Sequence, residues 1–385
     1  MKNHFWKAAL CAAMVPFALA GCGGGDDGGV QTGTLHVAMT DAPSCGFDHI
    51  YVTVSQVRVN ANTNASDNDA GWSTITLATP RKIDLLSLTN GVLADIGQTA
   101  LPAGQYQQIR LVLAPNQGNS LANSVVPTGG TEQALATPSA TQSGYKIIQP
   151  FTVQANTLVD LVLDFNACKS IVQRGNGTYA LKPVVTAIPT VVSGAISGYV
   201  APAEAGATVY AEQGGKVVRG TVADSTGKFV LSPLIQSSTQ GNYDVVIVQN
   251  NFASGIVRTV PVVVNTTTAV SASNAPITLP ASTMSSVSGT VTASADALVR
   301  ALQTVDARAY EITSINANMD TGAYALNVPT AAPIVGTYSG SLPVALAASP
   351  AAAAQYTIEA DAASGATQST NVNATTSQSN VNFSF

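Results

Sequence analysis

Charged side chains are scarce in this sequence, where Asp, Glu, Lys and Arg together make up 10% of the residues. The 16 Lys and Arg residues form no long run. Because a nucleic-acid interface needs clustered basic side chains that neutralise phosphates, we expect no nucleic-acid partner. The net charge of -5 bears on solubility and says little about partners.

Histidine is scarcer still, which limits the chemistry that the chain can support. Of the three histidines, only His36 and His49 lie beyond the first 21 residues, although histidine is the commonest general acid or base in enzymes. A hydrolase nucleophile is often found in a Gly-x-Ser-x-Gly turn, but residues 336–340 place the serine one position late. We therefore expect no catalytic triad, no cofactor and no enzymatic activity.

Two further ligand motifs are incomplete. Residues 220–228 end in Gly-Lys, but the spacing does not fit a phosphate-binding loop, and Phe229 replaces the required Ser or Thr. Residues 60–69 are rich in oxygen ligands, yet they lack the leading Asp, the central Gly and the closing Glu of a calcium loop. We interpret residues 60–69 as a solvated hairpin loop before Trp72 and predict no metal site there.

The N-terminus carries the strongest local pattern. Lys2 and Lys7 accompany a short apolar stretch at residues 8–20, which is typical of a signal peptide. The sequence Leu19-Ala20-Gly21-Cys22 resembles a bacterial lipobox. This resemblance implies cleavage before Cys22, diacylglycerol on its sulfur, and acylation of its new amino group, for example by palmitate.

We therefore predict a signal peptide at residues 1–21 and a Gly-rich flexible tether at residues 22–33. The expected partner is a membrane, reached through the lipidated N-terminus. Gly23 stands where an Asp would resemble an inner-membrane retention signal. We therefore expect a lipid-anchored protein of the cell envelope, at the outer membrane of a Gram-negative bacterium.

The remaining cysteines suggest a disulfide. Once Cys11 leaves with the signal peptide and Cys22 is lipidated, Cys45 and Cys168 remain. Two such thiols in an exported protein most simply form one disulfide. In the alternative, both cysteines bind a metal with His36 and His49, but their spacing matches no usual zinc pattern.

The periodicity of the chain predicts an all-β fold. Short runs of alternating apolar and polar residues are separated by turn residues, and no long stretch has helical periodicity. We predict an antiparallel sandwich or barrel at residues 34–190. Two smaller β-sandwiches follow at residues 193–280 and 285–385, the second a degenerate repeat of the first.

Two strands of the first domain allow more detailed predictions. Residues Ile50, Val52 and Val54 share one face, and the apolar phase changes after Gln56, which indicates a β-bulge. In the strand expected at residues 108–113, alternation predicts one core face and one partly wet face. The core residues are Ile109, Leu111 and Leu113, and the wet ones are Gln108, Arg110 and Val112.

Five motifs occur in order along the first domain. They are Thr40-Asp41-Ala42-Pro43, Ile83-Asp84-Leu85-Leu86, Leu101-Pro102-Ala103-Gly104-Gln105-Tyr106, Leu163-Asp164-Phe165 and Leu181-Lys182-Pro183. Together they resemble the DUF4382 family of bacterial lipoproteins, which implies no established activity. Asn166 departs from the family, whose members often have a second acid there, and this weakens a metal proposal at that point.

The second domain shows a different pattern. A Gly-x-Val strand at residues 198–200 precedes an Ala-x-Val-x-Ala strand at residues 207–211 and an Asp-x-x-Gly-x-Phe hairpin at residues 224–229. This order resembles carboxypeptidase regulatory-like, transthyretin-like β-sandwiches. The resemblance implies an accessory binding or spacer module without catalysis. In the hairpin, Gly227 supplies the positive φ of a tight turn.

A weak candidate site for a ligand or cation combines Asp41, His49 and Asp164. Asp41 follows a strand and precedes Cys45, while Asp164 precedes Cys168, so a disulfide would bring the two acids close. Alternatively, Asp41 caps a turn and Asp164 faces solvent or pairs with an arginine. A sugar-stacking surface is conceivable from Tyr51, Trp72 and Tyr106, but aromatic residues in small sandwiches are more often core.

These observations favour a non-catalytic, lipid-anchored envelope protein with a binding, adhesion or structural role. Its partner would be a glycan, a peptide or another envelope protein. The rival interpretation is a metal-assisted hydrolase that uses first-domain carboxylates such as Asp41 and Asp164.

Overall fold

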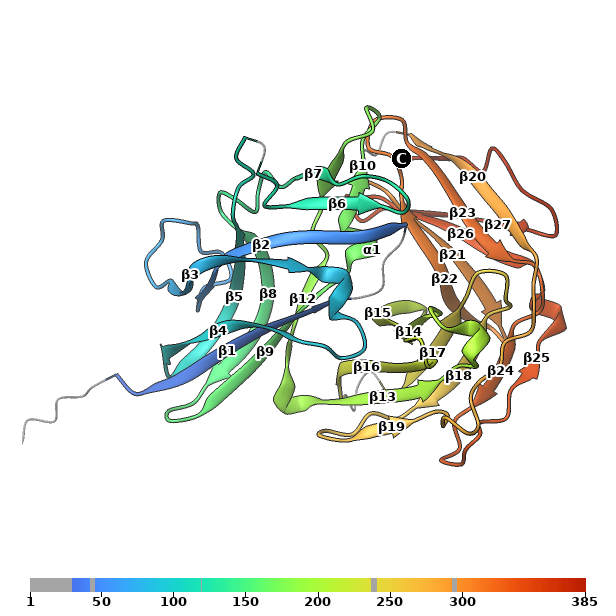
Figure 1. The fold of residues 1–385 in the computed structure, drawn as a ribbon, viewed down its shortest axis with the longest axis horizontal. Helices are drawn as coiled ribbons and strands as arrows, with labels where there is room; N and C mark the ends of the chain where they lie inside the picture. Colours follow the sequence, from blue (N-terminus) through green and yellow to red (C-terminus); the bar gives the residue numbers. More distant parts are fainter. Residues whose placement is uncertain (1–29, 42–45, 119, 237–240, 293–295) are drawn as a thin grey trace, which may run out of the picture. The chain divides into compact units, whose positions relative to one another are not determined.

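The first domain has two sheets, as a computed structural model shows for residues 30–41, 46–118, 120–236, 241–292 and 296–385. The smaller sheet has the order β12-β9-β1-β4, and Figure 1 shows β1 between its neighbours. These strands are β1 (Thr32–Asp41), β4 (Ala94–Pro102), β9 (Leu158–Phe165) and β12 (Val185–Pro189). β1 runs parallel to β9 and antiparallel to β4.

The larger sheet has the order β10-β11-β7-β6-β2-β5-β8, with β3 paired to β2. Its strands are β2 (Phe47–Asn60), β3 (Ser73–Asp84), β5 (Gly104–Leu113), β6 (Ser124–Pro127), β7 (Gln133–Ala136), β8 (Tyr145–Val153), β10 (Ile171–Gln173) and β11 (Tyr179–Leu181). Short helical turns are η1 (Leu85–Leu88), α1 (Ala167–Ser170) and η2 (Thr190–Val192). The sheet is open, not a closed barrel.

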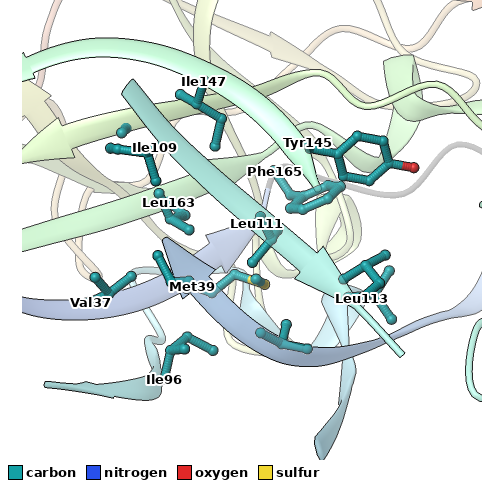
Figure 2. Packing of buried hydrophobic residues seen from close by; sticks show 14 of the residues in the cluster. Val37, Met39, Ile96, Ile109, Leu111, Leu113, Tyr145, Ile147, Leu163 and Phe165 are labelled. Atoms are coloured by element: carbon teal, nitrogen blue, oxygen red, sulfur yellow. The ribbon is translucent and has the colours of Figure 1, made fainter. Parts of the chain in front are cut away.

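The first core lies between these two sheets. Alternation along β1 turns Val37 and Met39 inward, where register places them beside β9 residues of the same face. Figure 2 shows Met39, Leu163 and Leu111 packed together, with Phe165 nearby. The period of two in each strand is therefore what builds this core.

The bulge predicted in β2 is present. The pairing of β2 with both β3 and β5 shifts register between Val54 and Gln56. Because of this shift, Val57 buries its side chain on the same core as Val52 and Val54. The change of phase in the sequence thus predicted a real irregularity of the backbone.

The face of β5 predicted to be partly wet is half-buried at Val112 but buried at Gln108 and Arg110. The loop between β2 and β3 folds over their face of β5, and both side chains are buried. Arg110 pairs with Asp67 and donates a hydrogen bond to the Ala65 carbonyl at 2.9 Å. The predicted hairpin loop exists, but it is a packed cover and not only a solvated connection.

Two sheets enclose the second core. They have the orders β16-β13-β19 and β15-β14-β17-β18-β24-β25. Their strands are β13 (Ser193–Tyr199), β14 (Thr208–Gln213), β15 (Lys216–Val222), β16 (Lys228–Ile235), β17 (Tyr243–Val248), β18 (Gly255–Val260), β19 (Thr267–Ala269), β24 (Ile334–Thr337) and β25 (Ala347–Ala348). η3 (Pro202–Glu204) lies between β13 and β14.

The turn at residues 224–228 differs from the expected hairpin. Gly227 has φ +81°, as predicted, and Asp224 accepts hydrogen bonds from Thr226 and Lys228. The strands on either side, β15 and β16, belong to different sheets. The tight turn therefore carries the chain from one layer of the sandwich to the other.

Both faces of the β17 sheet are buried. Val245 and Ile247 pack into the second core, whereas Val246 packs into the third. A strand covered on both faces needs apolar residues at every position, which explains the unbroken run at residues 245–248. The third segment also adds β24 and β25 to this sheet, so the two later segments share one layer.

The third core lies under two more sheets, with the orders β23-β20-β28 and β22-β21-β26-β27. Their strands are β20 (Met284–Thr292), β21 (Leu298–Val305), β22 (Arg308–Asn316), β23 (Ala323–Pro329), β26 (Gln355–Asp361), β27 (Thr367–Asn373) and β28 (Phe383–Ser384), with η4 (Pro350–Ala352) before β26. The predicted all-β class with several sandwiches is confirmed. Among the described residues, no helix is apolar and long enough to cross a membrane.

Candidate functional site

Asp164 forms a buried ion pair with Arg219. The carboxylate is on β9 of the first domain and the guanidinium is on β15 of the second, and both residues are buried. Arg219 also donates a hydrogen bond to Thr40 Oγ1 at 3.1 Å and another to the Ser232 carbonyl. Burial raises the pKa of Asp164, and the charge of Arg219 opposes that shift.

Asp41 does not join Asp164 in one site. In the parallel pairing of β1 with β9, Asp164 is opposite Thr40, so Asp41 points to the other face of the sheet. There Asp41 Oδ1 accepts a hydrogen bond of 3.0 Å from the Ala167 backbone. Neighbouring strands therefore hold the two acids, but a cation between their carboxylates is not favoured by this geometry.

The histidines have other partners. His49 contacts Asp84 at 2.7 Å and stacks on Tyr51. His36 lies between Asp160 and Asp95, at 2.7 and 2.9 Å. Burial lowers the pKa of His36, but the two carboxylates outweigh this effect and raise it overall. Among the residues that the structure describes, no group of three or more His, Cys, Asp or Glu side chains is placed to hold a metal ion.

Only one of the two cysteines of the predicted disulfide, Cys168, is among the described residues. Cys45 lies outside the described residues, as do Cys22 and the predicted signal peptide. Cys168 is in α1, directly after β9. The pairing of Cys45 with Cys168 and the lipidation of Cys22 therefore stay predictions.

A cluster of ion pairs joins the first and third segments of the fold. Lys169 in α1 contacts Glu311 on β22 at 2.8 Å. Arg300 on β21 contacts Glu311 at 3.3 Å and Asp361 at 3.0 Å, and it also pairs with Glu359. We call this cluster, together with the Asp164 and Arg219 pair, the charged junction.

A cavity of about 260 Å³ lies inside the charged junction. Its lining includes four basic side chains (Lys169, Lys216, Arg219, Arg300) and three acidic ones (Asp164, Glu311, Asp361). Most of these groups are already paired with one another across the segments. We therefore interpret the charged junction as a structural connection and not as a ligand site.

Glu212 on β14 lies beside this junction. Its Oε2 accepts a hydrogen bond of 3.1 Å from the Glu311 backbone, while Oε1 is buried without a hydrogen-bond partner in the described structure. Burial raises the pKa of Glu212 well above its usual value, and the negative charge of Glu311 raises it further. The protonated form is thus the one that suits the fold.

Replacing Glu212 by Gln is expected to make stability less dependent on pH. Because the pKa of Glu212 is higher in the folded state than in the unfolded state, its protonation supports folding fully below the unfolded value. That contribution is lost as the pH rises toward the folded value. Melting temperatures of both proteins from about pH 4 to about pH 9 test this.

The Glu212→Gln variant should be the more stable protein at the alkaline end, since its side chain is neutral throughout. Glu132→Gln is a suitable control at the alkaline end, because that side chain is 42% exposed and binds Lys82 at the surface. Identical pH profiles for wild type and Glu212→Gln would contradict the raised pKa of Glu212.

The larger cavity is a groove of about 770 Å³, which we call the uncharged groove. The first domain contributes Phe47 and Tyr179, the second contributes Tyr210, and the third contributes residues 312–316 and 323–327. None of its described lining residues is charged. Its size is in the usual range for ligand pockets, and its lining combines aromatic rings with amide and hydroxyl groups.

Comparison with protein families assigns the first segment. Residues 32–183 match the family described as "Domain of unknown function (DUF4382)". This segment is a DUF4382 domain. No curated protein matches the sequence.

Several solved structures show limited likeness. A type II cohesin–X-dockerin complex from Acetivibrio cellulolyticus is 27% identical over 23% of this chain, with a TM-score of 0.19. The Bacillus anthracis TIE protein is 11% identical over 92% of this chain (TM-score 0.17), and a streptococcal ancillary pilin is 8% identical over 92% (TM-score 0.17). This chain covers 58%, 51% and 99% of those chains, respectively. At such TM-scores the likenesses give no evidence on function.

The aromatic residues that the DUF4382 domain contributes to the uncharged groove differ from the three that the sequence indicated. Tyr106 is buried against Phe151, Trp72 lies under Arg58 and Arg110, and Lys82 covers Tyr51. Tyr106 is a core residue, as the alternative interpretation held, whereas Tyr51 and Trp72 are half-buried and lie outside the core. The rings of the groove, Phe47 and Tyr179, meet edge to face at 5.5 Å. Nothing in their local sequence marks them, because the groove forms only when three segments meet.

Proposed function

We propose that this protein is a non-catalytic, lipid-anchored protein of the cell envelope that binds a glycan, a peptide or another envelope protein. The uncharged groove is the observation that carries the proposal. It is the larger of the two cavities at the meeting of the three segments, and its lining has the aromatic and amide groups typical of binding sites. The resemblance of residues 193–280 to carboxypeptidase regulatory-like modules, itself a prediction, fits an accessory role.

The rival, a metal-assisted hydrolase, has little support. Its proposed carboxylates, Asp41 and Asp164, lie on opposite faces of their sheet, and each has another partner. Stoichiometric bound zinc or manganese together with hydrolytic turnover, measured on the purified mature chain, would reverse this preference.

Anchoring rests on the sequence Leu19-Ala20-Gly21-Cys22. We propose that three acyl chains on Cys22 hold the protein at the outer membrane, since one chain alone binds only marginally. The tether predicted at residues 22–33 would span at most about 40 Å when extended. The folded part would thus remain close to the membrane surface.

Cys22→Ala is expected to abolish incorporation of a clickable palmitate analogue and to move the protein out of the membrane fraction. The reason is that the sulfur and the new amino group of residue 22 are the only acceptors in the proposal. Cys11→Ala is the matched control, because Cys11 lies in the segment predicted to be removed. Labelling that survives Cys22→Ala would end the anchoring proposal.

A further inference from the structure

Three strand edges meet at the uncharged groove. β22 and β23 are each the first strand of their sheet, and β10 is the first strand of the large sheet of the DUF4382 domain. All three strands contribute residues to the lining, including Ile171 and Gln173 from β10. An edge strand has backbone N–H and C=O groups on one side that no neighbouring strand pairs.

The lining shows that these edges are turned toward the cavity. Residues 312–316 of β22 and 323–327 of β23 line the groove without interruption. Side chains in a strand alternate between two faces, so five consecutive residues reach one cavity most simply where the strand presents its edge. The backbone of both strands therefore borders the groove.

Hydrogen bonds tie β22 to neighbouring elements at both ends of this stretch. At one end, the Glu311 N–H donates to Glu212 Oε2 at 3.1 Å. At the other end, the Asn316 amide donates to the carbonyls of Lys169 and Ile171, at 2.9 and 3.1 Å. Residues 312–315 lie between these two contacts and border the open groove.

This stretch has neither of the two side-chain devices, charge and proline, that usually protect an exposed edge. Natural edge strands are blunted by charges, by proline or by covering segments. Residues 312–316 read Ile-Thr-Ser-Ile-Asn, and residues 323–327 read Ala-Tyr-Ala-Leu-Asn. Neither contains a charge or a proline, although the charged junction begins at the adjacent Glu311. Ile315 is 39% exposed and offers an apolar contact.

We propose that the uncharged groove binds an extended, uncharged peptide segment of a partner protein, which adds to β22 as a further strand. Backbone hydrogen bonds would supply most of the affinity, and pockets for alternate side chains would supply selectivity. A charged segment would lose its hydration without finding a counter-charge in the described lining. The proposal rests on the binding role proposed above and names the ligand class.

The test begins with a phage-displayed library of random dodecapeptides, selected on the mature chain. Enriched peptides should be poor in charge, and their affinities should be measured by calorimetry. Ile315→Lys places a charge beside the edge and should weaken binding at least about tenfold, because charge is the usual device that blocks strand addition. Ile148→Lys on β8 is the matched control, since Ile148 is 50% exposed and lies outside the groove.

A second variant tests the same groove in case Ile315→Lys fails to fold. Ala325→Glu puts a charge on the exposed face of β23 in the groove, and Ala100→Glu on β4 is its control. Groove variants should weaken the same peptides, and the controls should not. Peptides that bind every variant equally would overturn the proposal.

N-methylated versions of one selected peptide separate strand addition from other modes of docking. Methyl groups on alternate residues should abolish binding in one register and spare it in the other, because only every second N–H of an added strand points to β22. Equal binding of both registers would overturn strand addition. Maltohexaose or cellohexaose binding that Ala325→Glu abolishes would also overturn it, while leaving the binding role intact. Loss of palmitate labelling in wild type would instead count against the anchoring proposal.

Discussion

Replacing Arg219 by Met is expected to lower the free energy of unfolding by about 3–5 kcal/mol, the usual cost of removing one partner of a buried ion pair. The reason is the environment of Asp164, whose side chain is 7% exposed and loses its counter-charge. Arg219 also donates to Thr40 and Ser232, so further acceptors lose their donor. Urea unfolding of the mature chain measures the effect.

The companion variants show whether the loss comes from an unpaired charge. Arg219→Met combined with Asp164→Leu removes both ions and should restore most of the stability, because apolar pairs often replace buried ion pairs at little cost. Lys82→Met removes a surface pair with Glu132 and should cost about 0–1 kcal/mol. A double variant as unstable as Arg219→Met alone would contradict this account.

Much of the fold could be predicted from local periodicity. Alternation located β1, β5 and β9, and the change of phase near Gln56 located the bulge in β2. The same period of two does not say what covers a strand. Arg110 looked partly wet because its cover is a loop that no alternation marks. The turn at Gly227 was recognised from its residues, but its neighbours could not reveal that β15 and β16 belong to different sheets.

The candidate sites were harder to predict, because they depend on contacts between distant segments. Asp164 and Arg219 are 55 residues apart and belong to different sheets. Pairing of Asp164 with an arginine was one of three alternatives, beside exposure to solvent and a shared site with Asp41, but the sequence did not identify which arginine. The uncharged groove depends on Phe47, Tyr210 and residues 312–316, which share no motif. An uninterrupted apolar run, as at residues 245–248, was the one available sign that the later segments pack together.

Breaking the predicted bridge between Cys45 and Cys168 is expected to lower the free energy of unfolding by about 4–5 kcal/mol in the chain-entropy model, because it would close a loop of over a hundred residues. The Asp41 hydrogen bond to the Ala167 backbone, at 3.0 Å, brings the neighbourhoods of the two cysteines together. Cys168 directly follows Ala167, and Cys45 is four residues beyond Asp41. An oxidising compartment would favour the bond.

Cys168→Ala and Cys45→Ala should therefore destabilise the exported protein equally, and the double variant should be no worse than either single variant. Both single variants should also expose one titratable thiol, whereas wild type should expose none after lipidation of Cys22. Cys11→Ala is the matched control, since Cys11 lies within the predicted signal peptide. Reduction should lower the melting temperature of wild type and leave the double variant unchanged, because only wild type has a bond to lose. Two thiols titrated in native wild-type protein would rule out the bridge.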